Sequence, residues 1–167
     1  DVPVFVWPRF RTSLNNPSMY LERFSINNDR IFGAQVRTGW DLYQILGWEQ
    51  PEGREWIGVV DYLSERGLGF GTESKYQQDS FLGFPGVVSG EYKSWFIQDE
   101  GLDFLGQDRV NLIPEEGEGR GRIIARHRHE FPSDWILRGE IGYLSDRNFL
   151  EQFYEREWDT EKDATTG

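Results

Sequence analysis

The chain of 167 residues contains no cysteine, and this absence excludes disulfide bridges and thiolate-bound metals. No stretch approaches about eighteen consecutive apolar residues, which excludes a transmembrane helix. A transmembrane β-barrel is not excluded, because each of its strands needs only ~9–11 residues. The sequence starts without methionine and without a signal peptide, so we expect a mature or excised piece of a protein.

Positive charge is also scarce. Lysine and arginine number 18 against 29 aspartates and glutamates, and the formal net charge of -11 argues against a nucleic-acid-binding protein, which needs a basic surface. Aromatic residues, in contrast, make up 16% of the chain, too many for a disordered acidic segment. This content fits a large core, a sugar-binding surface or the aromatic girdles of a membrane barrel.

Strand-length stretches of the chain alternate strictly between apolar and polar side chains. Between residues 33 and 43, one face carries Ala34, Val36, Thr38, Trp40 and Leu42, and the other carries Gly33, Gln35, Arg37, Gly39, Asp41 and Tyr43. Residues 135–144 alternate in the same way. Because successive side chains of a strand point to opposite faces, the pattern predicts a sheet with one apolar and one polar side.

Turn residues separate the alternating stretches at hairpin spacing. Strands are predicted at residues 19–27, 31–45, 56–65, 68–76, 87–97, 120–131 and 135–144, with an edge strand or connector at 2–10 and a long loop at 98–119. Near the end, Phe149, Leu150, Phe153, Tyr154 and Trp158 recur at helical spacing, which predicts a short amphipathic helix from about residue 147 to 157. The predicted fold class is all-β, an antiparallel up-and-down meander with a short helix near the C-terminus.

Two histidines are the weak candidates for a metal site. The spacing Gly121-x5-His127-x-His129 matches the opening of the cupin metal motif, and two imidazoles two residues apart on a strand can reach one metal. The match then fails, because Ser133 and Asp134 stand where the glutamate belongs and the chain has no third histidine. We therefore expect no metal and no cofactor, and interpret both histidines as polar strand residues.

No constellation of catalytic residues is evident, and none is predicted. The carboxylates Asp61, Glu73, Glu91 and Glu140 lie on polar strand faces near lysine or arginine, as ion-paired residues do, and no pair stands out as a glycosidase pair. The arginines Arg120, Arg122, Arg126 and Arg128 share one face. They could bind phosphate or carboxylate groups, but the acidity of the chain favours pairing with neighbouring strands.

Several short motifs, in their order along the chain, resemble the family of the LPS-assembly outer-membrane protein LptD (organic solvent tolerance protein). They are Val2-Pro3-Val4-Phe5, Pro8, the aromatic strand with Trp40, Asp61-Tyr62-Leu63 before Arg66-Gly67, and Ser145-Asp146-x-x-Phe149-Leu150 after Gly142-Tyr143-Leu144. The resemblance implies that the chain is a segment of a longer protein and covers the start of its outer-membrane barrel. Residues 1–30 would enter from a preceding jelly-roll domain, residues 31–145 would form the early barrel strands, and residues 146–167 would form the short helix and a polar tail.

The resemblance implies a role in the assembly of the outer membrane, without enzymatic activity. The family's barrel holds a plug lipoprotein, receives lipopolysaccharide from a periplasmic bridge protein and releases it to the outer leaflet through a lateral seam. Prolines weaken the first strands of familiar members. Here Arg37 to Gly39 and Asp61 occupy the positions of those prolines, and neither strand contains a proline. Glycine inside a strand also weakens pairing, so the possible seam residues are those around Gly39: Val36, Thr38, Gly39 and Trp40.

The polar face is the predicted path for lipopolysaccharide or a related glycolipid. Its predicted residues are Gln35, Arg37, Asp41, Glu73, Lys75, Arg138 and Glu140. The alternative is that these charges only pair across strands. Two other functions stay open: a soluble β-sandwich that binds carbohydrate through exposed aromatics, and a cupin-like metal enzyme. In either soluble fold, Trp135, Leu137 and Ile141 should pack against a second layer of the same molecule.

Overall fold

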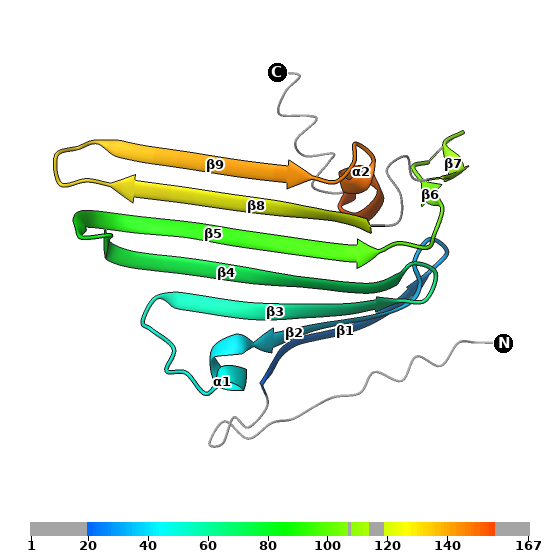
Figure 1. The fold of residues 1–167 in the computed structure, drawn as a ribbon, viewed down its shortest axis with the longest axis horizontal. Helices are drawn as coiled ribbons and strands as arrows, with labels where there is room; N and C mark the ends of the chain where they lie inside the picture. Colours follow the sequence, from blue (N-terminus) through cyan, green and yellow to red (C-terminus); the bar gives the residue numbers. More distant parts are fainter. Residues whose placement is uncertain (1–19, 107, 114–118, 156–167) are drawn as a thin grey trace.

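The computed structural model describes residues 20–106, 108–113 and 119–155, and most of them belong to one antiparallel sheet (Figure 1). Its seven strands follow the order β1-β2-β3-β4-β5-β8-β9. The strands are β1 (Leu21–Asp29), β2 (Gly33–Asp41), β3 (Arg54–Leu63), β4 (Gly67–Phe81), β5 (Phe84–Gln98), β8 (Gly119–Glu130) and β9 (Ile136–Leu144). The prediction of an all-β antiparallel meander is confirmed, and the sheet is compatible with part of a barrel.

The register of the strands places the predicted alternation on two faces. Opposite Cα partners such as Arg37 and Asp61 in β2 and β3, or Val60 and Phe70 in β3 and β4, keep the same character from strand to strand. We call the side with Arg37 the polar face and the side with Val60 the apolar face. A sheet that keeps this register across all its strands separates water-facing from apolar side chains along its whole width.

The apolar face of the sheet has no second layer among the described residues. Trp135, Leu137 and Ile141 are 75%, 54% and 73% exposed, and Phe24, Tyr62, Phe70, Phe96 and Tyr143 on the other strands are exposed as well. An apolar surface of this extent on one side of a sheet is unusual for a soluble monomer. The arrangement differs from a sandwich, in which these side chains would interdigitate with a second sheet.

The core lies on the opposite side, at one end of the polar face. The helix α2 (Phe149–Phe153) is shorter than the predicted helix and packs Phe149 and Leu150 against Leu63, Trp95 and Ile97. The Trp95 indole lies over Gly69 of β4, where a Cβ would be only 2.5 Å from the ring, so the ring fits because this residue is glycine. The amphipathic pattern of this segment is explained by burial on the sheet.

Three local predictions need correction. The strand predicted at residues 31–45 ends at Asp41, because the Asp41 carboxylate caps the helix α1 (Leu42–Leu46) and Gly47 ends it in the left-handed conformation. The β4–β5 turn lies at Leu82 and Gly83, with φ of 51° and 84°, instead of Phe84-Pro85-Gly86. The predicted loop at 98–119 contains a small sheet of β6 (Asp103–Phe104) and β7 (Val110–Leu112).

The division into a leading segment, barrel strands and tail stays a prediction. The described part of the leading segment includes β1, which pairs with β2 in the same sheet. The Val2-Pro3-Val4-Phe5 motif and most of the polar tail lie outside the described residues. Neither helix in the described part of the chain has the length and apolar character needed to cross a membrane.

Candidate functional site

The predicted path residues all lie on the polar face. They come from β2 (Gln35, Arg37 and Asp41), β4 (Glu73 and Lys75) and β9 (Arg138 and Glu140), and the register puts each on the same side of the sheet. The structure divides them between two depressions. A groove of about 990 Å³ is lined by Lys75, Arg138 and Glu140, and a pocket of about 320 Å³ by Arg37 and Glu73. Gln35 and Asp41 line neither.

Several of these residues have intramolecular partners. Gln35 donates to Asp29 and accepts from Arg37 at 3.1 Å. Asp41 caps α1, as described above. Glu73 pairs with Arg23 of β1 at 3.0 Å, and Glu140 pairs with Arg126 at 2.9 Å. The charges of Glu73 and Glu140 are therefore used in cross-strand pairing, and the role of all seven residues as a path stays a prediction.

A row of alternating charge crosses the larger groove. Its members are directly opposite one another on five neighbouring strands: Glu55, Lys75, Glu91, Arg126 and Glu140. Arg126 bonds both of its acidic neighbours, at 3.0 Å to Glu91 and 2.9 Å to Glu140. Opposite charges that face one another across strands stabilise the sheet, each pair by roughly 0.2–1 kcal/mol. The row also gives the groove a hydrophilic surface that carries both positive and negative charges.

The seam residues lie in a strand that is paired on both sides. Val36, Thr38 and Trp40 are on the apolar face and Gly39 is on the polar face, and β2 bonds β1 on one side and β3 on the other. Thr38 is further tied by a 2.7 Å hydrogen bond from its hydroxyl to the carbonyl of Val60. In the described sheet, the edges are β1 and β9. A lateral seam at β2 stays a prediction.

The two histidines lie on the apolar side of β8, each with another partner. His127 Nδ1 shares a 2.6 Å hydrogen bond with the Tyr76 hydroxyl, and His129 Nε2 donates to the carbonyl of Pro85 at 3.2 Å. The His129 ring also stacks on Phe131, with centroids 3.9 Å apart. Among the residues that the structure describes, no group of three or more histidines, cysteines or carboxylates is placed to hold a metal ion.

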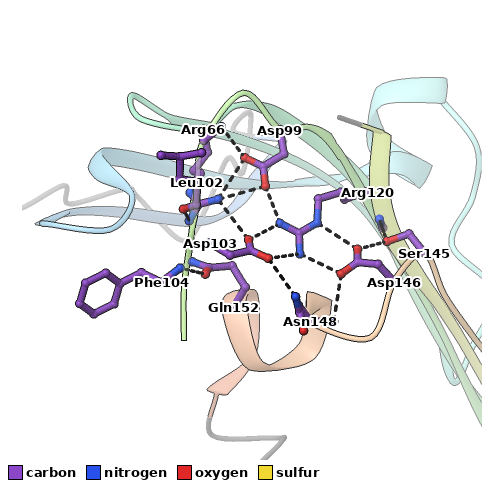
Figure 2. A network of polar contacts seen from close by, with 12 residues as sticks. Arg66, Asp99, Leu102, Asp103, Phe104, Arg120, Ser145, Asp146, Asn148 and Gln152 are labelled. Carbon is purple, nitrogen blue, oxygen red and sulfur yellow. Dashed lines mark hydrogen bonds and ion pairs between the residues drawn. The ribbon is translucent and has the colours of Figure 1, made fainter. Parts of the chain in front are cut away.

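A buried cluster of charged side chains lies at the α2 end of the sheet (Figure 2). We call it the arginine–aspartate cluster, and its members are Arg66, Asp99, Asp103, Arg120 and Asp146. Arg120 bonds Asp103 at 2.6 Å, Asp99 at 2.8 Å and Asp146 through two nitrogens at 2.9 Å each. Arg66 bonds Asp99 at 3.1 Å. Both arginines are at most 2% exposed.

The cluster joins segments that are far apart in the sequence. Arg66 sits in the β3–β4 turn, Asp99 and Asp103 follow β5, Arg120 begins β8, and Asp146 follows β9. Further polar groups complete it, including Ser145, whose hydroxyl donates to Asp146 at 2.8 Å, and Gln152, which accepts from the Phe104 backbone at 2.7 Å. With every charge paired in this way, burial of two cations and three anions becomes tolerable.

Sequence reasoning missed this cluster. It assigned Arg120 to pairing with neighbouring strands, named Arg66 and Asp146 only as parts of the short motifs of the family resemblance, and took residues 98–119 as a long loop. The available signal was the density of acidic residues in that loop beside two arginines at strand ends. That signal is weak, because exposed acidic loops have the same composition.

The cluster also sets the proton affinity of Asp146. Burial alone raises the pKa of this carboxyl, but hydrogen bonds from Arg120 and Ser145 outweigh burial, and the pKa lies below the ordinary value of 3.8. A carboxyl whose pKa is lowered by folding adds stability at pH values above its unfolded pKa. That stability is lost as the pH falls through the lower pKa of the folded state.

We therefore expect Asp146→Asn to lower the free energy of unfolding at pH 7 and to flatten its fall below about pH 4. Urea unfolding of the full-length gene product at several pH values between 7 and 2.5 measures this. The matched control is Asp134→Asn in the exposed β8–β9 turn, where asparagine tolerates the positive φ of 62°. Curves for Asp146→Asn and wild type that run parallel at every pH would contradict the assignment.

Comparison with known proteins relates the chain to LptD. It is 26% identical over 156 residues to the LPS-assembly protein LptD of Xanthomonas oryzae pv. oryzae, covering 93% of this chain and 16% of the relative. The LptD of Xanthomonas campestris pv. campestris is 26% identical over 155 residues, with the same coverages, and that of Xanthomonas euvesicatoria pv. vesicatoria is 27% identical over 125 residues, covering 75% and 13%. No family model matches the chain. No solved structure matches it either.

These identities support a distant LptD-like relationship. The chain spans about one-sixth of the length of the relatives, 16% in the first of them. The relatives are named for the assembly of LPS and not for an enzymatic reaction.

Proposed function

We propose that this chain is part of an outer-membrane barrel that assembles or exports lipopolysaccharide, or a related glycolipid, to the outer leaflet. The observation that carries the proposal is the single sheet with an exposed apolar face and a charged polar face. In a barrel wall, the apolar face contacts lipid and the polar face lines a hydrated interior. The distant LptD-like relationship supports the choice of cargo.

The dimensions and aromatic residues of the sheet support a location in a membrane. From Trp56 to Tyr62, the apolar face of β3 extends about 20 Å at ~3.3 Å per residue. The apolar band of outer-membrane barrels is ~25 Å tall. At the strand ends beside α1, the rings of Tyr43 and Trp48 lie 5.9 and 6.2 Å from that of Trp56. Amphipathic rings gather at the membrane–water interface.

On this proposal, the chain acts without catalysis. The polar face, with the row of alternating charge, offers hydrogen bonds to the hydrated head group of a glycolipid while the acyl chains stay in apolar surroundings. The proposed partners are lipopolysaccharide, a plug lipoprotein inside the barrel and a periplasmic bridge protein that delivers the cargo. The proposed location is the outer membrane of a Gram-negative-type cell.

The carbohydrate-binding alternative receives less support from the structure. A soluble sandwich needs a second sheet to cover the apolar face, and the described residues form one large sheet with that face exposed. The cupin-like alternative is weaker still, because His127 and His129 are occupied by hydrogen bonds with Tyr76 and Pro85.

Cross-linking from two neighbouring residues tests the proposal. A photoreactive amino acid at Lys75 faces the polar side, and the same amino acid at Ser74 faces the apolar side. In cells given a pulse of labelled sugar precursor, we expect labelled lipopolysaccharide to cross-link at Lys75 and to disappear from that position during the chase. At Ser74, any cross-link should persist, because lipid of the finished membrane surrounds that position.

Two results would contradict the proposed function. One is a gene product that stays in solution without detergent. The other is a Lys75 cross-link that is absent or does not change during the chase.

A further inference from the structure

We propose that Arg128 and Arg138 form a binding site for a phosphate group of a phosphorylated glycolipid on the polar face. This inference rests on the proposed function, because it names the chemical group that the larger groove recognises. The two arginines are directly opposite each other in β8 and β9, and both line the groove of about 990 Å³. Directly opposite residues have Cβ atoms about 4.5–5.5 Å apart.

Two like charges in this position are unfavourable unless an anion lies between them. The row that contains them continues through Ser89 and Gln77, so it includes no acidic residue. By contrast, the neighbouring row of Glu55, Lys75, Glu91, Arg126 and Glu140 alternates in sign. Only Glu130, two residues along β8, balances Arg128 within the described residues, and the charge of Arg138 has no acidic partner in this row.

The acidic residues within reach of the pair are already bonded. Glu140 accepts from Arg126 at 2.9 Å, and Glu130 pairs with Arg128 at 2.6 Å. Arg138 has neither a hydrogen bond nor an ion pair among the described residues, and its strand is exposed. Its whole guanidinium fork is thus available to a ligand from the groove.

The charge of the groove agrees with an anionic ligand. Its polar-face lining includes the cations Lys75, Arg126, Arg128 and Arg138 against the anions Glu55, Glu91 and Glu140. With Arg128 paired to Glu130, the remaining charges balance, whereas the chain as a whole has a formal net charge of -11. Guanidinium groups bind phosphate through two parallel hydrogen bonds, which makes an arginine pair a better phosphate clamp than two lysines.

Binding measurements on the full-length gene product in detergent test the site. The probes are a glucosamine-disaccharide glycolipid that carries phosphate, the same glycolipid without phosphate, and inorganic pyrophosphate. For the phosphorylated glycolipid we expect Arg138→Gln to weaken binding roughly tenfold, as the loss of one charge-assisted contact does. Arg138→Lys should give an intermediate loss, since it keeps the charge and loses the fork. Arg30→Gln removes the same charge from the exposed β1–β2 turn and should have no effect.

The possible outcomes distinguish failure of the phosphate site from failure of the proposed export function. Equal binding of the two glycolipids, or equal affinity of Arg138→Gln and wild type, overturns the phosphate site and leaves the Lys75 pulse–chase result to decide the export function. If an acidic residue of another strand neutralised Arg138, the variant would bind like wild type and the site would be rejected. Pyrophosphate that binds as tightly as the phosphorylated glycolipid would overturn the assignment to a glycolipid. Phosphate-dependent binding without a transient Lys75 cross-link would retain the site and reject export.

Discussion

Replacing Arg120 by methionine is expected to lower the free energy of unfolding by about 3–5 kcal/mol, the usual loss when one partner of a buried ion pair is removed. Arg120 is the only residue of the cluster that bonds three aspartates, Asp99, Asp103 and Asp146. Without it, Arg66 would be left beside Asp99 and Asp103, and Asp146 would lose the two hydrogen bonds that Arg120 donates. Guanidinium chloride unfolding of the full-length gene product, followed by tryptophan fluorescence, measures the loss.

The control is the same substitution six residues further along the strand. Arg126 also bonds two acids, Glu91 and Glu140, but its side chain is 42% exposed. Exposed ion pairs contribute only about 0–1 kcal/mol, because water and salt screen them. Arg126→Met should therefore be nearly neutral. Equal losses for Arg120→Met and Arg126→Met would show that burial of the cluster is not what stabilises the fold.

The cluster matters because of what it holds in place. Arg66 and Arg120 contact α2 through the Phe153 ring, with the guanidinium carbons 5.7 and 5.3 Å from its centroid. Helix α2 in turn covers Trp95 and closes the core at this end of the polar face. Disruption of the cluster should thus release α2 from the sheet and shift the fluorescence of Trp95 to longer wavelength.

The sheet could be predicted from the sequence because its signal is local. Each strand alternates with a period of two, so the faces of residues 33–41 or 136–144 follow from the strand itself. The exceptions are also local but depend on single side chains. Asp41 fits the alternation of the strand, but its carboxylate also caps α1 and so ends the strand. The alternating pattern alone does not reveal this capping role.

The arginine–aspartate cluster could not be predicted in the same way. Its ion pairs join residues separated by 17 to 37 positions, and no periodicity relates Arg66 to Asp99 or Arg120 to Asp103. Only the order of the strands, with β8 beside β5, brings the loop after β5 to the start of β8. The position of the predicted path residues, in contrast, could be predicted, because alternation alone puts them on one face. Their function depends on which molecule binds in the groove.

A second large effect is expected on the apolar face. Phe70 of β4 is 55% exposed and lies between Val60 and Phe96 on the neighbouring strands. If this face contacts the hydrocarbon of a bilayer, Phe70→Arg should lower the free energy of unfolding by about 2–4 kcal/mol, the cost of arginine near the bilayer midplane. On a soluble protein, an exposed phenylalanine could become arginine within about ±0.5 kcal/mol.

The matched control places the same substitution at the end of a strand. Phe84 starts β5 beside the turn at Leu82 and Gly83, and it is similarly exposed. Near the membrane interface an arginine costs only about 0–1 kcal/mol, since its charged end reaches water. Urea unfolding in lipid vesicles should therefore separate Phe70→Arg from Phe84→Arg. Two variants with the same small effect would place the apolar face in water, and the membrane location of this sheet would have to be abandoned.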